Sequence, residues 1–174
     1  SQQLFVDLNK HAVRPSTSLN VLFEHREALA DLAKLLADKV TGFRGLVDME
    51  RTSISNRSTK LFTLSGIYQA TKALLQKKKG DEVTEADRQL AVRFWNTLST
   101  VFPEWEQASE RKVSTYDLRH EYVHAHGVVL HALGIVGASL VATYPQDWHE
   151  RLRGLRKLDW SRTNTRFWEG RAMI

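Results

Sequence analysis

The sequence predicts a mainly α protein, an orthogonal helical bundle with one polar loop or short extended insert near residues 43–63. Apolar residues recur every three or four positions through most of the 174 residues, as they do on the buried face of a helix. Capping signals, such as Thr84 with Asp87 three positions later, precede several of these stretches. No repeat or linker divides the chain, so we expect a single helical domain over 1–174.

Apolar spacing and stop signals define the expected helices. They cover residues 2–12, 18–41, 64–79, 85–102, 115–143 and 145–157. The first stops at Pro15, the third at the lysines before Gly80, and the fourth at Pro103. Nothing in the apolar pattern of residues 115–143 demands a break, so we expect one long helix there. Gly127, Gly134, Gly137 and Ala138 should let its neighbours approach closely.

The pattern changes between Gly42 and Thr63. Residues 51–60 contain one apolar side chain, Ile54, among many hydroxyls. We interpret this stretch as an exposed loop between short extended segments at 46–49 and 61–63.

Composition narrows the function classes. The chain has no cysteine, which excludes disulfides, thiolate nucleophiles and cysteine-ligated zinc and fits a cytoplasmic protein. The longest apolar stretch, 127–144, is borderline for a bilayer and contains His131, so we expect a buried helix and no membrane association. The formal net charge is +5, and residues 151–174 hold seven Lys or Arg against two acids. Such asymmetry is typical of contact with a polyanion, although a solvated basic tail would look the same.

One motif points to an enzyme. Residues 120–124 read His-Glu-Tyr-Val-His, which matches the zinc-protease pattern, and a continuous helix would bring His120 and His124 onto one face with Glu121 as general base. The third ligand of the extended pattern would fall at Leu130, and the nearest histidine, His131, lies one residue late. A zinc-dependent hydrolase therefore stays an alternative, and a polar, hydrogen-bonded histidine stripe is the preferred interpretation.

Other catalytic signals are weaker. The phosphate-loop, dinucleotide and nucleophile-elbow motifs do not occur, and Asp48 with Glu50 resembles a nuclease metal pair only loosely. We expect a protein that is not an enzyme and that uses no cofactor and no metal.

Two basic segments suit a DNA duplex. The loop 51–60 offers cations, hydroxyls and Asn56 for phosphate oxygens and base edges, and the tail interleaves aromatic side chains with arginines. Ordinary polar loops and solvated tails give the same composition. The candidate DNA-contacting residues are Arg14, Arg51, Arg57, Lys60, Arg151, Arg153, Arg156, Lys157, Arg162 and Arg166.

The stretches Gln3 to Leu19 and Ile54 to Gly66 resemble the DndB family of bacterial DNA phosphorothioation systems. The Asp-Gly-Gln-His-Arg motif of the wider group does not occur here, so the likeness covers the family's C-terminal half, and we expect the chain to be the C-terminal portion of a longer protein. The resemblance implies a transcriptional repressor that binds promoter DNA of the modification genes. It implies no catalytic residue in this half. A structural oligomerisation domain is a third hypothesis, and homo-oligomers are compatible with either role.

Overall fold

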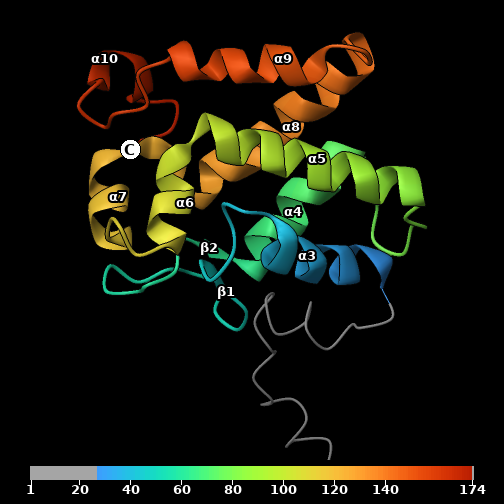
Figure 1. The fold of residues 1–174 in the computed structure, drawn as a ribbon, viewed down its shortest axis with the longest axis horizontal. Coiled ribbons are helices and arrows are strands. Elements are labelled where there is room, and N and C mark those ends of the chain that lie inside the picture. The colour runs from blue at the N-terminus through green and yellow to red at the C-terminus, as the bar shows by residue number, and fades with distance from the viewer. Residues whose placement is uncertain (1–26, 174) are drawn as a thin grey trace, which may run out of the picture.

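The computed structural model describes residues 27–173 and confirms a mainly α fold (Figure 1). The helices are α3 (Ala28–Lys39), α4 (Leu64–Leu75), α5 (Glu85–Val101), α6 (Pro103–Ser109), α7 (Thr115–Glu121), α8 (Gly127–Thr143), α9 (Trp148–Arg153) and α10 (Thr165–Trp168). Two 3₁₀ turns, η1 (Val123–Ala125) and η2 (Gly154–Lys157), complete the helical part. In Figure 1, α5 runs across the middle between α3 below and α9 above, while α6 and α7 stand steeply at one end. None of the helices between residues 27 and 173 combines the length and apolar composition that a membrane crossing requires.

The extended insert also forms as expected. β1 (Val47–Asp48) and β2 (Phe62–Thr63) pair in parallel, with Val47 opposite Phe62. The backbone N–H groups of Leu61 and Phe62 both donate to the carbonyl of Leu46, which adds hydrogen bonds between the two extended segments beside the paired strands. Residues 51–60 leave this small sheet as the predicted polar loop, which lies at the lower left of Figure 1.

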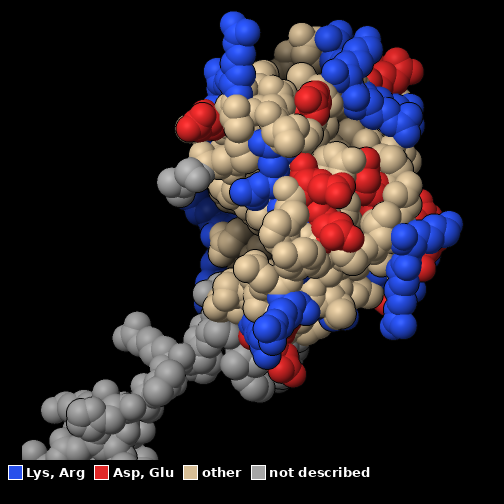
Figure 2. Space-filling model, turned by 90° about the vertical axis from the view of Figure 1, so that its left-hand side faces the viewer, with Lys and Arg blue, Asp and Glu red and all other residues tan. Residues whose placement is uncertain are grey.

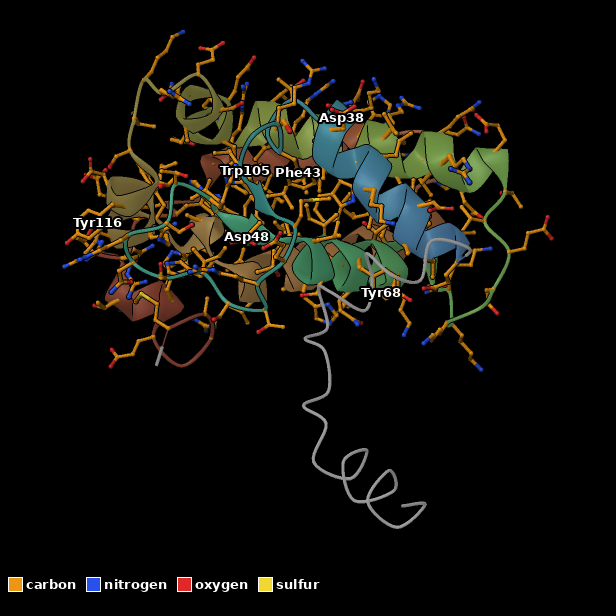
Figure 3. All side chains as sticks on the ribbon, turned by 90° about the horizontal axis from the view of Figure 1, so that it is seen from below. Asp38, Phe43, Asp48, Tyr68, Trp105 and Tyr116 are labelled. Atoms are coloured by element: carbon orange, nitrogen blue, oxygen red, sulfur yellow. The ribbon has the colours of Figure 1, made fainter. Side chains whose placement is uncertain are left out.

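Aromatic side chains form the centre of the core. Phe43, Trp95 and Trp105 are fully buried, and the Phe43 ring lies 5.6 Å from Trp95 and 5.9 Å from Trp105. Figure 3 shows Phe43 and Trp105 side by side in the interior, whereas Tyr116 lies at the outer end. The indole of Trp95 donates to Thr71 Oγ1 at 3.0 Å, which satisfies its buried N–H.

Glycines bring α8 close to its neighbours, as the sequence indicated. A Cβ on Gly134 would lie 2.2 Å from the carbonyl oxygen of Ala70 in α4, and one on Gly137 would lie 2.4 Å from the Phe94 ring. The same expectation was wrong for Gly127, whose Cβ position has no neighbour within 4 Å. Close helix packing therefore depends on the middle of α8 and not on its start.

Several helix ends differ from the sequence-based expectation. Glu27 is extended, with its carboxylate accepting from Tyr68 Oη, so α3 begins at Ala28, and it ends at Lys39, two residues before the predicted end. Residues 18–26 of the predicted helix lie outside the described residues. Helix α4 ends in a left-handed Gln76, before the lysines and Gly80 that were predicted to end it. Helix α9 begins at Trp148 and not at Pro145. The predicted capping box of Thr84 and Asp87 is confirmed, and the expected helix over 2–12 lies outside the described residues.

The largest error concerns residues 115–143, which form two helices and not one. Tyr122 is extended, with φ −128° and ψ 139°, and it pairs with Ser161 in an antiparallel bridge. Val123 donates to the carbonyl of Trp160 at 3.0 Å, and Arg162 donates to the carbonyl of Glu121 at 2.8 Å. Backbone groups that a continuous helix would satisfy internally are thus satisfied by the tail, some 40 residues later. Local periodicity carries no information about such a partner.

Candidate nucleic-acid interface

The polar loop presents its cations from a fixed turn. The Asp48 carboxylate accepts from the backbone N–H groups of Glu50 and Arg51, at 3.0 and 2.9 Å, where the loop leaves β1. Burial alone would raise the pKa of Asp48, but these donors and the charges of Arg51 and Lys60 outweigh it and lower the pKa. Arg51 and Arg57 are exposed, and residues 51–60 contain no acid. Lys60 is half-buried and donates from Nζ to the carbonyl of Gly45 at 2.9 Å.

Arg119 of α7 fixes the backbone of this loop through hydrogen bonds. Its Nη1 donates to the carbonyl of Lys60 at 2.5 Å, and its Nη2 donates to those of Asn56 and Ser58 at 3.1 and 2.9 Å. Thr115 Oγ1 donates to the same Ser58 carbonyl at 2.7 Å. The Arg119 side chain is only 8% exposed, and desolvation lowers its pKa. Sequence reasoning missed Arg119, because its role depends on a loop nearly 60 residues earlier.

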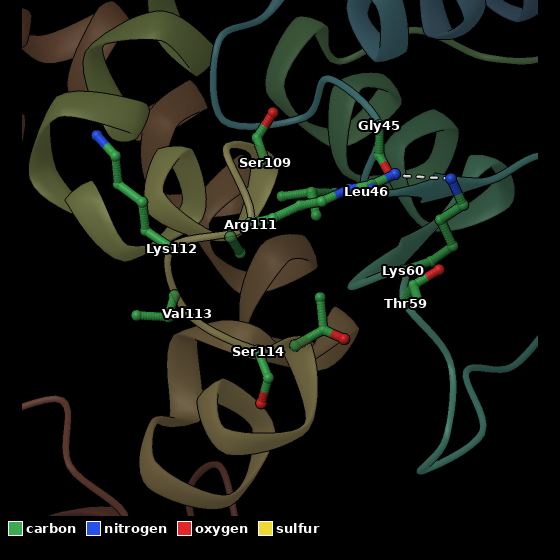
Figure 4. Close-up of a pocket in the computed structure, with 11 residues that line it drawn as sticks. Gly45, Leu46, Thr59, Lys60, Ser109, Arg111, Lys112, Val113 and Ser114 are labelled. Carbon is green, nitrogen blue, oxygen red and sulfur yellow. Dashed lines mark hydrogen bonds between the residues drawn. The ribbon is translucent and has the colours of Figure 1, made fainter.

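A groove adjoins the loop, and two of the cations that line it, Arg111 and Lys112, were not selected from the sequence. This basic groove has a volume of about 640 Å³, and Lys60, Arg111 and Lys112 line it together with the hydroxyls of Thr59 and Ser114 (Figure 4). Arg111 adopts a left-handed conformation with φ 60°, and Figure 4 shows its side chain extending toward Leu46. Lys112 points away from the groove centre and pairs with Glu110 at 2.5 Å.

Three of the predicted tail cations are engaged within the protein. Arg151 pairs with Asp147 at 3.0 Å and stacks over the Tyr144 ring at 3.5 Å. Arg156 donates twice to the carbonyl of Thr100, and Arg162 Nη1 lies 2.9 Å from His126 Nε2.

The other three tail cations are exposed. The side chains of Arg153, Lys157 and Arg166 make no hydrogen bond, ion pair or ring contact within residues 27–173. Arg14, the remaining candidate, lies outside the described residues.

The structure does not merge the loop and the tail into one surface. Helix α9 lies at the top of Figure 1 and the loop at the bottom. Among the predicted tail cations, Arg162 contacts the residue that anchors the loop, since its Nη1 is 3.5 Å from the carbonyl oxygen of Arg119. Figure 2 shows a compact group of acidic side chains in the middle of one face, with lysines and arginines around it. The loop and the tail are therefore two separate basic surfaces.

The histidine motif does not form the predicted zinc-binding face. His120 is exposed on α7, where its Nδ1 donates to the carbonyl of Tyr116 at 3.0 Å. His124 lies beyond the break, in η1, and is 1% exposed. Because the helix ends at Glu121, the spacing of four residues no longer places both rings on one face. Across residues 27–173, no group of three or more potential ligands could hold a metal ion.

His124 serves the core. Trp105 Nε1 can only donate, so it fixes His124 Nδ1 as the acceptor at 3.2 Å and leaves the ring proton on Nε2, which faces Glu104 at 3.6 Å. The His124 ring stacks on Phe102 at 4.5 Å and on Tyr122 at 4.9 Å. Burial lowers the pKa of His124 to about 3, so the ring is neutral at physiological pH.

Comparison with known families assigns the whole chain. A family model described as DndB, DNA-sulfur modification-associated, matches residues 1–174. The chain belongs to the DndB family. Comparisons with curated proteins and with solved structures found no match. The association with DNA sulfur modification is therefore established at the level of the family.

Proposed function

We propose that this chain is a non-catalytic, DNA-binding module of a transcriptional repressor that regulates genes for DNA sulfur modification. Its partner is double-stranded DNA of the promoter region, and it acts in the cytoplasm. Membership of the DndB family supports the link to DNA sulfur modification. The observation that carries the DNA contact is the polar loop, in which Arg51 and Arg57 are exposed while Arg119 fixes the backbone beneath them.

The mechanism is phosphate neutralisation from a preformed loop. A fixed backbone costs less ordering on binding, so the guanidinium groups need only exchange counterions for phosphates. The basic groove extends this surface through Lys60 and Arg111. Arg153, Lys157 and Arg166 provide a second surface on the tail.

Fluorescence anisotropy with a promoter duplex at several salt concentrations tests the proposal. We expect the logarithm of the affinity to fall linearly as the logarithm of salt rises. The double substitution Arg51→Gln and Arg57→Gln should reduce that slope by about 2 and weaken binding to promoter and unrelated duplexes alike.

Lys78→Gln is the matched control. Lys78 is an exposed cation after α4, at the other end of the molecule, and its loss should leave the affinity nearly unchanged. Affinity that does not depend on salt, or that the Lys78 change lowers as much as the loop changes do, contradicts the proposal.

A specific observation favours oligomerisation as a second candidate function. An apolar groove of about 320 Å³ lies between α8 and the tail, and Val136, Leu158 and Phe167 in its wall are between 38% and 45% exposed. Light scattering over a range of protein concentrations would support this function if the mass rises without any affinity for DNA.

A further inference from the structure

We propose that the cavity beneath the polar loop is a binding site for a tetrahedral oxyanion of the phosphate class. This loop cavity has a volume of about 290 Å³ and is lined by Thr52, Ser53, Ile54, Asn56, Leu61, Phe62, Thr63, Arg119, Ala125, His126 and Gly127. The inference is independent of the proposed DNA contact, because it concerns residues behind the loop and a small ligand.

The first argument is the charge of Arg119. Its guanidinium is more than nine-tenths buried, yet all its hydrogen bonds go to neutral carbonyl groups, and no acid lines the cavity. A buried charge without a counter-ion is costly. In addition, Arg119 Nε is buried without any hydrogen-bond partner. An anion in the cavity would supply the missing counter-charge.

His126 is the second titratable group on the cavity wall. Its Nε2 lies 2.9 Å from Arg162 Nη1 and 3.0 Å from the carbonyl oxygen of Arg119. No interaction within residues 27–173 engages its Nδ1, so this nitrogen is available to a ligand. Burial, followed by the charges of Arg162 and Arg119, lowers the pKa of His126.

The third argument is the start of α8. This helix is 17 residues long, begins at Gly127 on the cavity wall, and has neither a side-chain cap nor an acid in its first turn. The first backbone N–H groups of a helix have no partner within it and carry a partial positive charge, which suits a phosphate oxygen. The space around the Gly127 Cα is open, so a ligand can approach these groups. Thr52 and Ser53 bring hydroxyls from the loop.

Isothermal titration with inorganic phosphate, and separately with sulfate, tests the site in the whole chain without DNA. We expect saturable binding of one anion per chain. Gly127→Pro removes one helix N–H and should weaken binding by about tenfold. Proline suits this first helical position, and the extended His126 before it, with ψ 141°, tolerates a following proline. The helix should therefore persist.

Ser53→Asp places a carboxylate on the cavity wall without disturbing the contacts of Arg119 with the loop, and it should abolish binding. Ser55→Asp is the matched control, because it adds the same charge to the same loop outside the cavity lining. Binding that survives Ser53→Asp, or that falls equally with Ser55→Asp, overturns the proposal, as does the absence of saturable binding to the unaltered chain.

The pKa of His126, measured by NMR titration with and without phosphate, tests the site separately from protein stability. A purely structural role of the cavity residues would leave this pKa unchanged on addition of phosphate. The charges of Arg162 from the tail and of Arg119 and His120 from α7 disfavour protonation of this ring, and neighbouring His124 is neutral in this pH range. A bound anion should raise the pKa of His126, and an unchanged pKa under saturating phosphate contradicts the proposal.

A short duplex then distinguishes the two sources of the anion. Displacement of inorganic phosphate by DNA would identify a backbone phosphate as the occupant, and simultaneous binding would identify a free oxyanion. Both results support the site. Phosphate binding with no DNA affinity would end the proposed function and leave this inference intact.

Discussion

The polar loop and the C-terminal tail are both basic, but they use their charges differently. The backbone of the loop is held by hydrogen bonds from Arg119, which lies outside the segment. Arg51 and Arg57 in the loop itself are exposed. In the tail, Arg156 and Arg162 themselves hold the segment to the helices beneath. The number of cations in a sequence therefore overstates the charge that a partner can reach.

The largest effect should come from the residue that holds the loop. Arg119→Met leaves the carbonyls of Asn56 and Lys60 without this donor and leaves the Ser58 carbonyl with Thr115 alone, and we expect the free energy of unfolding to fall by about 2 to 3 kcal/mol. Urea denaturation measures the loss, and faster trypsin cleavage after Arg51 and Arg57 would report a loosened loop. Arg153→Met, at an exposed position, should change stability by less than about 0.5 kcal/mol. Equal stability of the two variants would contradict the difference between loop and tail.

The second largest effect should be a loss of folding stability at acidic pH, caused by the buried His124. The pKa of His124 is lowered from 6.5 to about 3 in the folded protein. Between these values the unfolded chain binds a proton that the folded chain does not, so stability is complete above pH 6.5 and falls as the pH falls. At pH 5 the loss should be about 2 kcal/mol, since each pKa unit corresponds to about 1.4 kcal/mol.

Thermal denaturation at pH 5 and 7.5 measures the effect of His124. His124→Phe should flatten the pH dependence, whereas His120→Gln, at an exposed position, should retain it. A profile that is unchanged by His124→Phe would show that another group is responsible.

The smallest effect should be the difference in stability between loss of an engaged tail arginine, Arg156, and loss of an exposed one, Arg153. Arg156→Ala removes the guanidinium that binds the Thr100 carbonyl in the last turn of α5, and we expect a loss of about 1 kcal/mol at most. Arg153→Ala should have no measurable effect on stability, because no described residue contacts its charge. Chemical denaturation of the two variants side by side decides this, and an equal loss would mean that the tail is not held by Arg156.

Local signals explain which parts of the fold could be predicted. The capping box at Thr84, the break at Pro103 and the extended segments around the polar loop all depend on neighbouring residues, and the structure contains them. The break at Tyr122 and the hydrogen bonds of Arg119 depend on segments about 40 and 60 residues away. The spacing of apolar residues within 115–143 contains no information about these distant segments.

The candidate site follows the same rule. Exposed Arg51 and Arg57 could be selected because charge and loop composition are local properties. Arg111 could not, since its place in the basic groove depends on how the segment after α6 lies against residues 45–46 and 59–60. The histidine motif misled for the converse reason, because its chemistry requires a helix that the distant tail interrupts.

The bridge between Tyr122 and Ser161 also has a consequence for the order of folding. The chain is synthesised from its N-terminus, so residues 115–143 emerge before the segment that separates them into α7 and α8. Until residues 160–162 arrive, a straight helix satisfies the backbone of this region best, and the bend must form late. Arg119 and His126 lie on opposite sides of that bend, and Arg162 contacts both, so a segment made after them holds two cavity-lining residues in place.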